Sequence, residues 1–354
     1  MGSFGPLQVM NKSTATLKSI AETLRISIST VSRVLNDRAK KYRISDATVA
    51  KIKNEADRVG FAPNQIASAL RLQKTKTIAL VIPDISNGYF AAMAKVLGVE
   101  ARKAGYSLFL LDSLGQEKLE VEAVRLMRSR KVDGLIIAPA SANGQHIIEL
   151  KESGTPVILI DRYIKSMAIP SVCSDNVEAA FRATSFLITS GHQHIACIQG
   201  LNYLTSSVDR TQGYKNALSE YQIPENKSYF LGDDFSHQSG YVATKKLLKD
   251  CPQVTAILSL SHLNALGAMQ ALKEAGKHIP DDISLITFDD NPLFAYLSTP
   301  LTSVDQPNEA IGIETMQQLI AQINGESNSI EQKLLKTQLI LRDSVKVLKT
   351  AIKA

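Results

Sequence analysis

The sequence predicts an α/β protein with an N-terminal all-α helix-turn-helix domain and a two-lobed body built on parallel sheets. Short helical patterns with polar outer faces occupy residues 16–61, and two series of apolar strands alternating with helices follow from residue 76. The excess positive charge lies at the N-terminal end: residues 1–76 hold 14 Lys and Arg against 5 Asp and Glu, and the remaining residues hold 26 against 29. A basic domain joined to a near-neutral body is typical of proteins that bind polyanions.

Length and composition exclude several classes of protein. The chain has 354 residues, of which 44% are hydrophobic, so it can bury the cores of two or three domains. No apolar run reaches the ~18–20 residues that a membrane-spanning helix needs, and the N-terminus lacks the layout of a secretory signal. The 3 cysteines are too widely spaced for a disulfide framework or a metal motif. We therefore expect a cytoplasmic protein with no membrane association.

The helix-turn-helix pattern begins at residue 16, after a segment over 1–15 that is expected to be a flexible arm. The first helix is indicated by apolar residues at i, i+3, i+4 and i+7, which are Leu17, Ile20, Ala21 and Leu24. Ser27 suits the N-cap of a second helix that runs to about Leu35, with Val31 and Val34 facing inward. In such a motif the second helix enters the major groove of DNA.

The outer face of the second helix carries side chains that suit DNA. Residues near its start meet base edges, so Ile28 and Ser29 are expected to read bases. Arg33 lies about one turn later and can donate two hydrogen bonds to guanine O6 and N7. Short polar side chains suited to phosphate contacts are Thr16, Thr30, Ser32 and Asn36. The alternative is an ordinary three-helix bundle with a polar surface.

A third helix is expected to start after Ser45 as N-cap and to end at Gly60. Its apolar face consists of Val49, Ile52, Ala56 and Val59. The loop over residues 37–43 carries four basic side chains and is expected to lie along the phosphate backbone. A solvated charge run is the alternative for this loop.

The body pattern alternates strand and helix from residue 76. The first series predicts strands over 78–83, 107–111, 134–138 and 157–161, and helices over 89–104 and 117–130 with a short one after the third strand. The second predicts helices over 176–190, 208–221, 236–248 and 263–275, and strands over 195–199, 229–232, 256–260 and 283–287. Wholly apolar strands indicate parallel sheets covered on both faces. Two series make two lobes, with a cleft at the carboxyl ends of the strands.

Two stretches of the N-terminal part carry a family resemblance. The runs over residues 16–21 and 27–36, which include T-V-S-R-V-L-N, resemble the DNA-binding signature of the LacI/GalR family of bacterial transcriptional regulators. The run over 60–70, with P-N-x-x-A-x-x-L, is similar to the hinge of that family, and the match continues to about Ser344. The loop before Ser45 departs from the family by being longer and more basic.

The resemblance implies a hinge helix that forms when two protomers sit on DNA. Leu70 is then the wedge in the minor groove, with Asn64 and Ala67 contacting the groove on the same helix. An exposed helix of this length is too short to be stable alone. For Leu70 the alternative is a linker leucine packed on the body. The implied partners are a pseudo-palindromic double-stranded DNA operator and a second copy of the chain, with too short a tail for tetramers.

The resemblance also implies periplasmic-binding-protein-like lobes that the chain crosses three times, near Ser174, Val304 and Leu334. A helix over 307–324 returns to the first lobe, and one last strand lies near 335–342. The expected domains are an arm (1–15), a helix-turn-helix domain (16–61), a hinge and linker (62–75) and an effector-binding domain (76–346). Lobe 1 comprises about 76–174 and 305–332, and lobe 2 about 175–304 and 333–346.

Loops that follow the strands are expected to line the cleft and bind a small-molecule effector. Matching to the family implies as effector residues Ser86, Asn87, Tyr89, Phe90, Arg162, Arg210, Ser261, His262, Asp289 and Gln306. Carboxylates, guanidinium groups and amides around an aromatic ring suit a polyhydroxylated sugar or sugar derivative. Ser261 and His262 stand where the family usually has Asn-Asp. His262 therefore either favours an acidic sugar or phosphate, or braces its loop.

An enzyme is not expected. The chain has no G-x-G-x-x-G fingerprint, no P-loop and no G-x-S-x-G elbow. His192 and His194 lie two residues apart without a third ligand nearby, so we expect no metal, and no cofactor or catalytic residue. The sequence indicates a DNA-binding transcriptional regulator, most simply a repressor, whose effector changes lobe closure. The alternatives are a sugar-binding protein of transport, or a DNA-binding protein that has lost its effector site.

Overall fold

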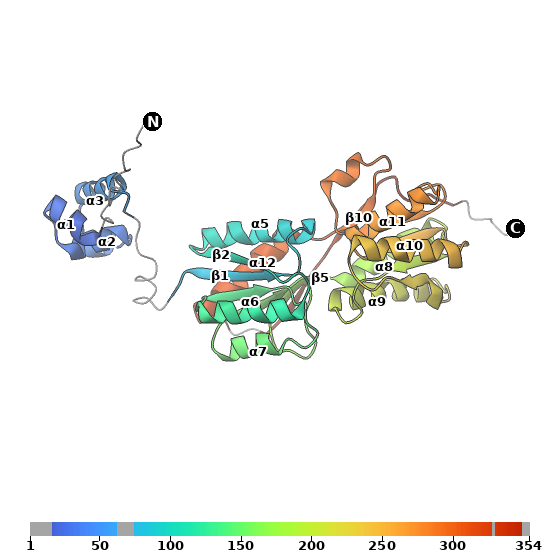
Figure 1. The fold of residues 1–354 in the computed structure, drawn as a ribbon, viewed down its shortest axis with the longest axis horizontal. Helices are drawn as coiled ribbons and strands as arrows, with labels where there is room; N and C mark the ends of the chain where they lie inside the picture. Colours follow the sequence, from blue (N-terminus) through green and yellow to red (C-terminus); the bar gives the residue numbers. More distant parts are fainter. Residues whose placement is uncertain (1–15, 62–73, 328–329, 349–354) are drawn as a thin grey trace, which may run out of the picture. The chain divides into compact units, whose positions relative to one another are not determined.

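The computed structural model describes residues 16–61, 74–327 and 330–348, and it divides between Thr75 and Lys76 into two compact units. Figure 1 shows the elements of both units along the chain. Within the described residues, no helix is both long and apolar enough to cross a membrane.

Residues 16–61, the described part of the N-terminal unit apart from its last two residues, form a three-helix bundle with the expected caps. Its helices are α1 (Leu17–Leu24), α2 (Ile28–Leu35) and α3 (Asp46–Arg58), with a 3₁₀ turn, η1 (Lys40–Tyr42), between the last two. The N-cap hydroxyls of Thr16, Ser27 and Ser45 each accept a backbone N–H from the first turn of their helix. Gly60 follows α3 with φ +62°, as predicted for a helix end.

The core of this unit confirms the predicted inward faces. Its fully buried apolar side chains are Ile20, Ala21, Val31, Val34, Ile52 and Ala56. Val49 and Val59, predicted on the same face of α3, are half-buried against this cluster. Further partly buried apolar side chains, Leu17, Leu24 and Phe61 among them, pack against this cluster and complete the core.

The body contains two sheets. Within the described residues, the first sheet has the strand order β11-β5-β4-β3-β1-β2, all parallel, and the second has β12-β10-β9-β8-β6-β7, in which only β12 is antiparallel. The strands of the first sheet are β1 (Thr77–Ile82), β2 (Ser107–Asp112), β3 (Gly134–Ile137), β4 (Val157–Ile160), β5 (Ser171–Ser174) and β11 (Gln332–Leu335). Those of the second are β6 (Ile195–Ile198), β7 (Phe230–Leu231), β8 (Ala256–Ser259), β9 (Ser284–Phe288), β10 (Thr302–Asp305) and β12 (Gln338–Ile340).

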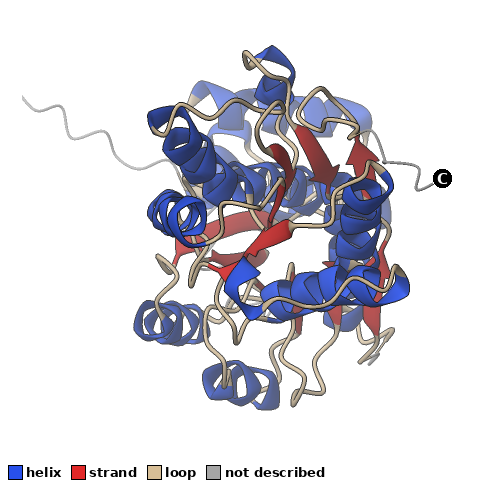
Figure 2. Cartoon of the chain, turned by 90° about the vertical axis from the view of Figure 1, so that its right-hand side faces the viewer, coloured by secondary structure: helices blue, strands red, loops and turns tan. Residues whose placement is uncertain are grey.

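Helices cover both faces of each sheet, as the apolar strands predict (Figures 1 and 2). The first lobe has α5 (Gly88–Lys103) and α12 (Asn308–Ile323) on one face and α6 (Glu117–Ser129) and α7 (Gln145–Glu152) on the other. The second lobe has α10 (His237–Asp250) and α11 (His262–Glu274) on one face and α8 (Asn176–Thr189) and α9 (Thr205–Glu220) on the other. Two further 3₁₀ turns are η2 (Lys227–Tyr229) and η3 (Pro292–Tyr296).

The chain passes between the sheets after β5, after β10 and between β11 and β12. The last strand, β12, lies within the predicted range 335–342, and the chain leaves the first sheet after Leu335, next to the crossover predicted near Leu334. Strand β11, which adds to the first sheet just before this crossing, was not predicted. Thr337 lies between β11 and β12 and accepts hydrogen bonds from Arg182 at its carbonyl and hydroxyl oxygens, both at 2.8 Å. Strand β5, Ser-Val-Cys-Ser, was not predicted because it is not an apolar run, and α9 starts three residues earlier than expected.

Helices α10 and α11 lie in close backbone contact through glycine. A methyl group at Gly240 would lie 2.1 Å from the carbonyl oxygen of Asn264, and one at Gly267 would lie 2.0 Å from that of His237. Only a residue without a Cβ allows this approach, which seats α11 and the residues that precede it at the end of the second sheet.

Gly240→Ala is therefore expected to lower the free energy of unfolding by about 1–3 kcal/mol through overpacking. Gly98→Ala is the matched control: it is also helical, but its added methyl would lie 3.8 Å from Leu108 Cδ2, and it should raise stability by about 1 kcal/mol. Urea unfolding followed by circular dichroism measures both. Equal midpoints for the two variants would contradict this account of the helix contact.

Candidate nucleic-acid interface and ligand cavity

The second helix of the N-terminal unit presents an exposed face opposite its buried valines. Ile28 is 48% exposed at the first position of α2, and Ser29 and Arg33 are also exposed. Ile28 does not belong to the apolar cluster that the described residues of this unit form. The geometry is compatible with the predicted contacts of these three residues with bases, and their roles stay predictions.

The predicted phosphate-contacting residues also have local structural roles. Thr16 caps α1, and the hydroxyl of Thr30 lies 2.8 Å from that of Ser27, the cap of α2. Asn36 donates from Nδ2 to the carbonyl oxygen of Ser32 at 2.6 Å and so closes the end of α2. These hydrogen bonds orient the side chains of Thr16, Thr30 and Asn36 within the unit itself. Asn64, Ala67 and Leu70 lie outside the described residues.

The basic loop after α2 is partly ordered by the η1 turn, which the sequence analysis did not predict. Arg38, Lys40, Lys41 and Arg43 are all exposed. Tyr42 in the same turn lies beneath Arg33, whose Cζ is 4.0 Å from the centroid of the tyrosine ring. The signal that could have indicated this contact is an aromatic residue within a run of basic ones.

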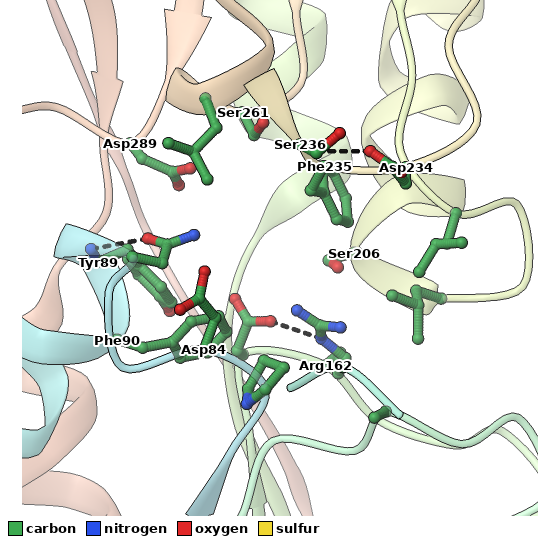
Figure 3. A pocket seen from close by; sticks show the side chains of 18 of the residues that line it. Asp84, Tyr89, Phe90, Arg162, Ser206, Asp234, Phe235, Ser236, Ser261 and Asp289 are labelled. Atoms are coloured by element: carbon green, nitrogen blue, oxygen red, sulfur yellow. Dashed lines mark hydrogen bonds and ion pairs between the residues drawn. The ribbon is translucent and has the colours of Figure 1, made fainter. Parts of the chain in front are cut away.

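A cavity of about 570 Å³ lies where strands of both sheets end (Figure 3). Seven of the predicted effector residues line it: Asn87, Tyr89, Phe90, Arg162, Arg210, Ser261 and Asp289. The volume falls within the range of small-molecule sites. Parallel strands explain the convergence, because their carboxyl ends meet at one edge of each sheet.

The first lobe contributes an aromatic pair to the cavity. The rings of Tyr89 and Phe90 meet edge to face, with centroids 5.0 Å apart, at the start of α5. Asn87 caps this helix by accepting the Tyr89 N–H at Oδ1. Tyr89 is 7% exposed, and its hydroxyl has no hydrogen-bond partner within the described part of the chain. Burial, followed by the charges of Asp161 and Asp289, raises the pKa of Tyr89 well above its usual value, so this hydroxyl stays protonated.

Aspartates occupy equivalent places after strands of the two sheets. Asp161 follows β4 with φ +64°, and Asp289 follows β9 with φ +67°. Such positive φ values are uncommon outside glycine and concentrate at functional sites. Asp161 accepts a hydrogen bond at 2.7 Å from Arg162 Nε, which orients this buried guanidinium group in the cavity.

Arg210 is held from the second lobe by three contacts. Its Nε donates to Asn176 Oδ1 at 2.8 Å, its Nη1 donates to the Leu260 carbonyl at 2.6 Å, and its Cζ lies 4.2 Å from the centroid of the Phe288 ring. These contacts fix the guanidinium group at the cavity wall, where it can donate to a ligand oxygen without losing side-chain freedom.

Asp289 is the centre of a hydrogen-bond chain that reaches the crossovers between the lobes. Gln306 Nε2 donates to Asp289 Oδ1 at 2.6 Å, and Ser174 Oγ donates to Gln306 Oε1 at 2.7 Å. His262 Nδ1 lies 3.2 Å from Asp289 Oδ2. Burial acts to raise the pKa of Asp289, but the hydrogen bond with His262 and the charge of Arg210 hold it below its ordinary value.

Three predicted effector residues do not line this cavity. Ser86 instead donates its N–H and its hydroxyl to Asp84 Oδ1, at 2.8 and 2.6 Å, and so orients a carboxylate that does line the cavity. His262 and Gln306 lie behind Asp289 as its partners. Ser261 lines the cavity, and its hydroxyl also caps α11 by accepting the Asn264 N–H.

Part of the cavity lining was not predicted, mainly the residues that follow strands β2, β6 and β7. Asp84 and Asp161 lie in loops that the sequence analysis assigned to the cleft, and both line the cavity. The lining residues that were not predicted include Leu114, Leu201, Leu204, Ser206, Asp234, Phe235, Ser236, His237 and Leu263. Figure 3 shows Asp234, Phe235 and Ser236 across the cavity from Asp84 and Phe90. The rule that loops after parallel strands line the cleft holds for these residues too, but no residue of the loops after β2, β6 or β7 was named, because the family resemblance pointed to none there.

The two histidines that invite a metal interpretation have structural partners. His192 Nδ1 lies 2.9 Å from Thr255 Oγ1, and its Nε2 lies 3.1 Å from the Lys346 carbonyl oxygen. His194 Nδ1 lies 3.0 Å from the Tyr229 hydroxyl. Burial is the main cause that lowers the pKa of His192, so its ring is a neutral member of the second lobe's packing at neutral pH.

Comparison with known proteins gives matches over both units. The family described as bacterial regulatory proteins, lacI family, matches residues 16–64. The family described as periplasmic binding proteins and sugar binding domain of LacI family matches residues 75–343.

Individual relatives cover nearly the whole chain. Catabolite control protein A of Priestia megaterium is 33% identical over 332 residues, which cover 94% of this chain and 99% of that protein. The HTH-type transcriptional repressor CytR of Escherichia coli K12 is 31% identical over 335 residues, covering 94% and 97%. The crystal structure of a LacI family regulator from Enterococcus faecium with bound ribose is 30% identical, with a TM-score of 0.70, and covers 77% of this chain and 100% of that one.

Tyr89→Phe is expected to raise the free energy of unfolding of the ligand-free protein by about 1 kcal/mol, because it removes a buried hydroxyl without a partner. Tyr214→Phe is the control: its buried hydroxyl donates to the Ile195 carbonyl at 2.7 Å, so its loss should lower stability by about 1 kcal/mol. Urea unfolding measures both. A loss of stability in Tyr89→Phe as large as that in Tyr214→Phe would show that Tyr89 is already satisfied.

Proposed function

The chain belongs to the LacI family of bacterial regulatory proteins and is a DNA-binding transcriptional regulator; we propose that it is a repressor controlled by a neutral sugar or sugar derivative that binds in the interlobe cavity. The single observation that carries this proposal is the combination, in one chain, of an exposed recognition helix with a polar cavity at the end of two parallel sheets. Its named relatives are regulators, and we assign it no catalytic reaction.

On the DNA side, we propose that two copies bind a pseudo-palindromic operator with one α2 helix in each half-site. The excess of basic residues in the N-terminal part supports contact with phosphates. Exposed apolar side chains on the edge strand β2 and the helices beside it support a homodimer: they are Val99, Phe109, Leu110 and Leu126. Because bacterial operator DNA lies in the cytoplasm, we place the protein there.

On the effector side, the charges that line the cavity support a neutral ligand. Four carboxylates, from Asp84, Asp161, Asp234 and Asp289, face two guanidinium groups, from Arg162 and Arg210, among the described residues. An anionic ligand would meet this negative excess. His262 is engaged with Asp289, which supports its role as a brace of the loop over its role as an anion-binding group. The relative crystallised with ribose supports a sugar.

Coupling between the two functions follows from the position of Asp289. A ligand hydroxyl that bonds to Asp289 competes with or strengthens the bonds from Gln306 and His262. Gln306 and Ser174 lie at crossovers, so a change at Asp289 alters the relative free energies of the lobe arrangements. The ligand shifts operator affinity only by its differential affinity for those arrangements.

Two other functions fit the chain less well. A transport protein has no use for the DNA-binding unit that matches the lacI family over residues 16–64. A regulator without an effector would have no reason to keep Arg210 and Asp289 fixed and buried around a large polar cavity, since buried charges are costly unless paired or used.

The test is a selection of genomic fragments by the full-length protein, followed by titration of neutral and acidic sugars by calorimetry. Preference for particular fragments at physiological salt, changed by a neutral sugar, is the expected result. Binding of acidic sugars alone would overturn the neutral-effector proposal, and equal affinity for all duplexes would overturn the regulatory one.

Arg33→Ala is expected to cost roughly 1–3 kcal/mol at the selected operator and to relax base preference at one position of each half-site. Arg33→Lys is the matched control, because it keeps the charge and loses the planar fork that donates two hydrogen bonds. It should lose base preference while keeping the salt dependence of binding. Fluorescence anisotropy on single-pair operator variants measures both, and unchanged preference in both variants would remove Arg33 from base reading.

A further inference from the structure

The basic loop between α2 and α3 contains one aromatic ring, and that ring supports the guanidinium group of Arg33. The Cζ of Arg33 lies 4.0 Å from the centroid of the Tyr42 ring. Within the described part of the chain, no carboxylate or carbonyl group accepts a hydrogen bond from this guanidinium group. The stack with Tyr42 is therefore what determines where an otherwise unrestrained, exposed side chain lies.

The loop holds Tyr42 in place from both sides. The Arg38 N–H donates to the Arg33 carbonyl at 2.9 Å, which turns the chain back toward α2, and the Tyr42 N–H donates to the Ala39 carbonyl at 3.2 Å within η1. The Ile44 N–H donates to the same Ala39 carbonyl at 3.0 Å. Ala39 and Ile44 are half-buried against the helical core, so they anchor the turn that carries Tyr42.

The stack occupies one face of the guanidinium group and leaves its edge free. Cation–π contact uses the face of the planar group, whereas all five N–H donors lie in its plane. Bidentate recognition of guanine O6 and N7 uses that edge. A guanidinium group stacked on a fixed ring can adopt only a few orientations of its plane. It therefore loses less side-chain conformational entropy when it binds a base.

We propose that Tyr42 is a positioning residue that sets the plane of Arg33 for reading one base pair, so that the loop contributes to sequence specificity as well as to phosphate contact. This inference rests on the proposed function of α2 as the base-reading helix. It assigns different roles to adjacent residues: Lys41 adds positive charge near the duplex, whereas Tyr42 adds no charge but orients the side chain of Arg33.

The test compares Tyr42→Ala, Tyr42→Phe, Arg33→Ala and the Tyr42→Ala/Arg33→Ala double variant of the full-length protein. Anisotropy is measured on the selected operator and on single-pair variants of it. Tyr42→Ala should weaken operator binding about twofold to fivefold and flatten preference at the position that Arg33 reads. Tyr42→Phe keeps the ring and should behave as the wild type. In the Arg33→Ala background, Tyr42→Ala should have no further effect.

Lys41→Ala is the matched control from the same turn. It should weaken binding to every duplex alike and reduce the slope of log affinity against log salt by about 0.9, with base preference intact. Tyr42→Ala should leave that slope unchanged. Tyr42 is 42% exposed, so its replacement should leave the fold intact, which circular dichroism checks.

Two results would overturn the inference. Additive losses of operator affinity in the double variant would mean that Tyr42 contacts DNA itself. Tighter operator binding by Tyr42→Ala would mean that the stack on Tyr42 keeps Arg33 away from the base. Both presuppose a wild-type protein that prefers its operator. A wild type without any such preference would instead overturn the proposed function, and with it this inference, so the two failures are distinguishable.

Discussion

A buried carboxylate at the boundary of the two lobes is the interaction on which the body depends. Asp289 is 8% exposed, and its charge is kept by the Gln306 amide, the His262 ring and the nearby Arg210. A buried charge that loses its partners is strongly destabilising, so these groups must remain in place while Asp289 is ionised. Since Gln306 and its donor Ser174 lie at two crossovers, satisfying one carboxylate also constrains the relation of the lobes.

Under the proposed mechanism, this constraint lets a ligand in the cavity change the relative free energies of the lobe arrangements and, through them, operator affinity. In the cavity wall, Arg210, Arg162 and Asp84 are each oriented by a hydrogen bond with a neighbouring group. Asp289 differs from these three residues because one of its partners, Gln306, lies at a connection between the lobes, whereas His262 begins α11 of the second lobe. The N-terminal unit is built differently, with a small core and a charged surface whose local hydrogen bonds prepare side chains for a polyanion.

The sequence predicted helices and apolar strands well, because caps and periodicity are local signals. Ser27 and Ser45 begin helices as expected, and the predicted cavity residues follow strands because parallel strands end at one edge. Strand β5 was not predicted because its two apolar residues stand between two serines, which is too short a run to indicate a buried parallel strand. The contact between Asp289 and His262 was not predicted, because the two residues lie in separate segments that meet only when the second sheet is assembled.

The role of the hydrogen bonds that link Asp289 to Gln306 and Ser174 is tested most directly by the coupling free energy between effector binding and operator binding. This free energy is calculated from the ratio of operator affinities with and without saturating effector. In Gln306→Met, which has similar size but cannot hydrogen-bond to Asp289 or Ser174, we expect operator binding without effector and effector binding without operator to persist. Their coupling, typically about 1–3 kcal/mol in allosteric proteins, should fall by at least about half. Coupling equal to that of the wild type would contradict the account.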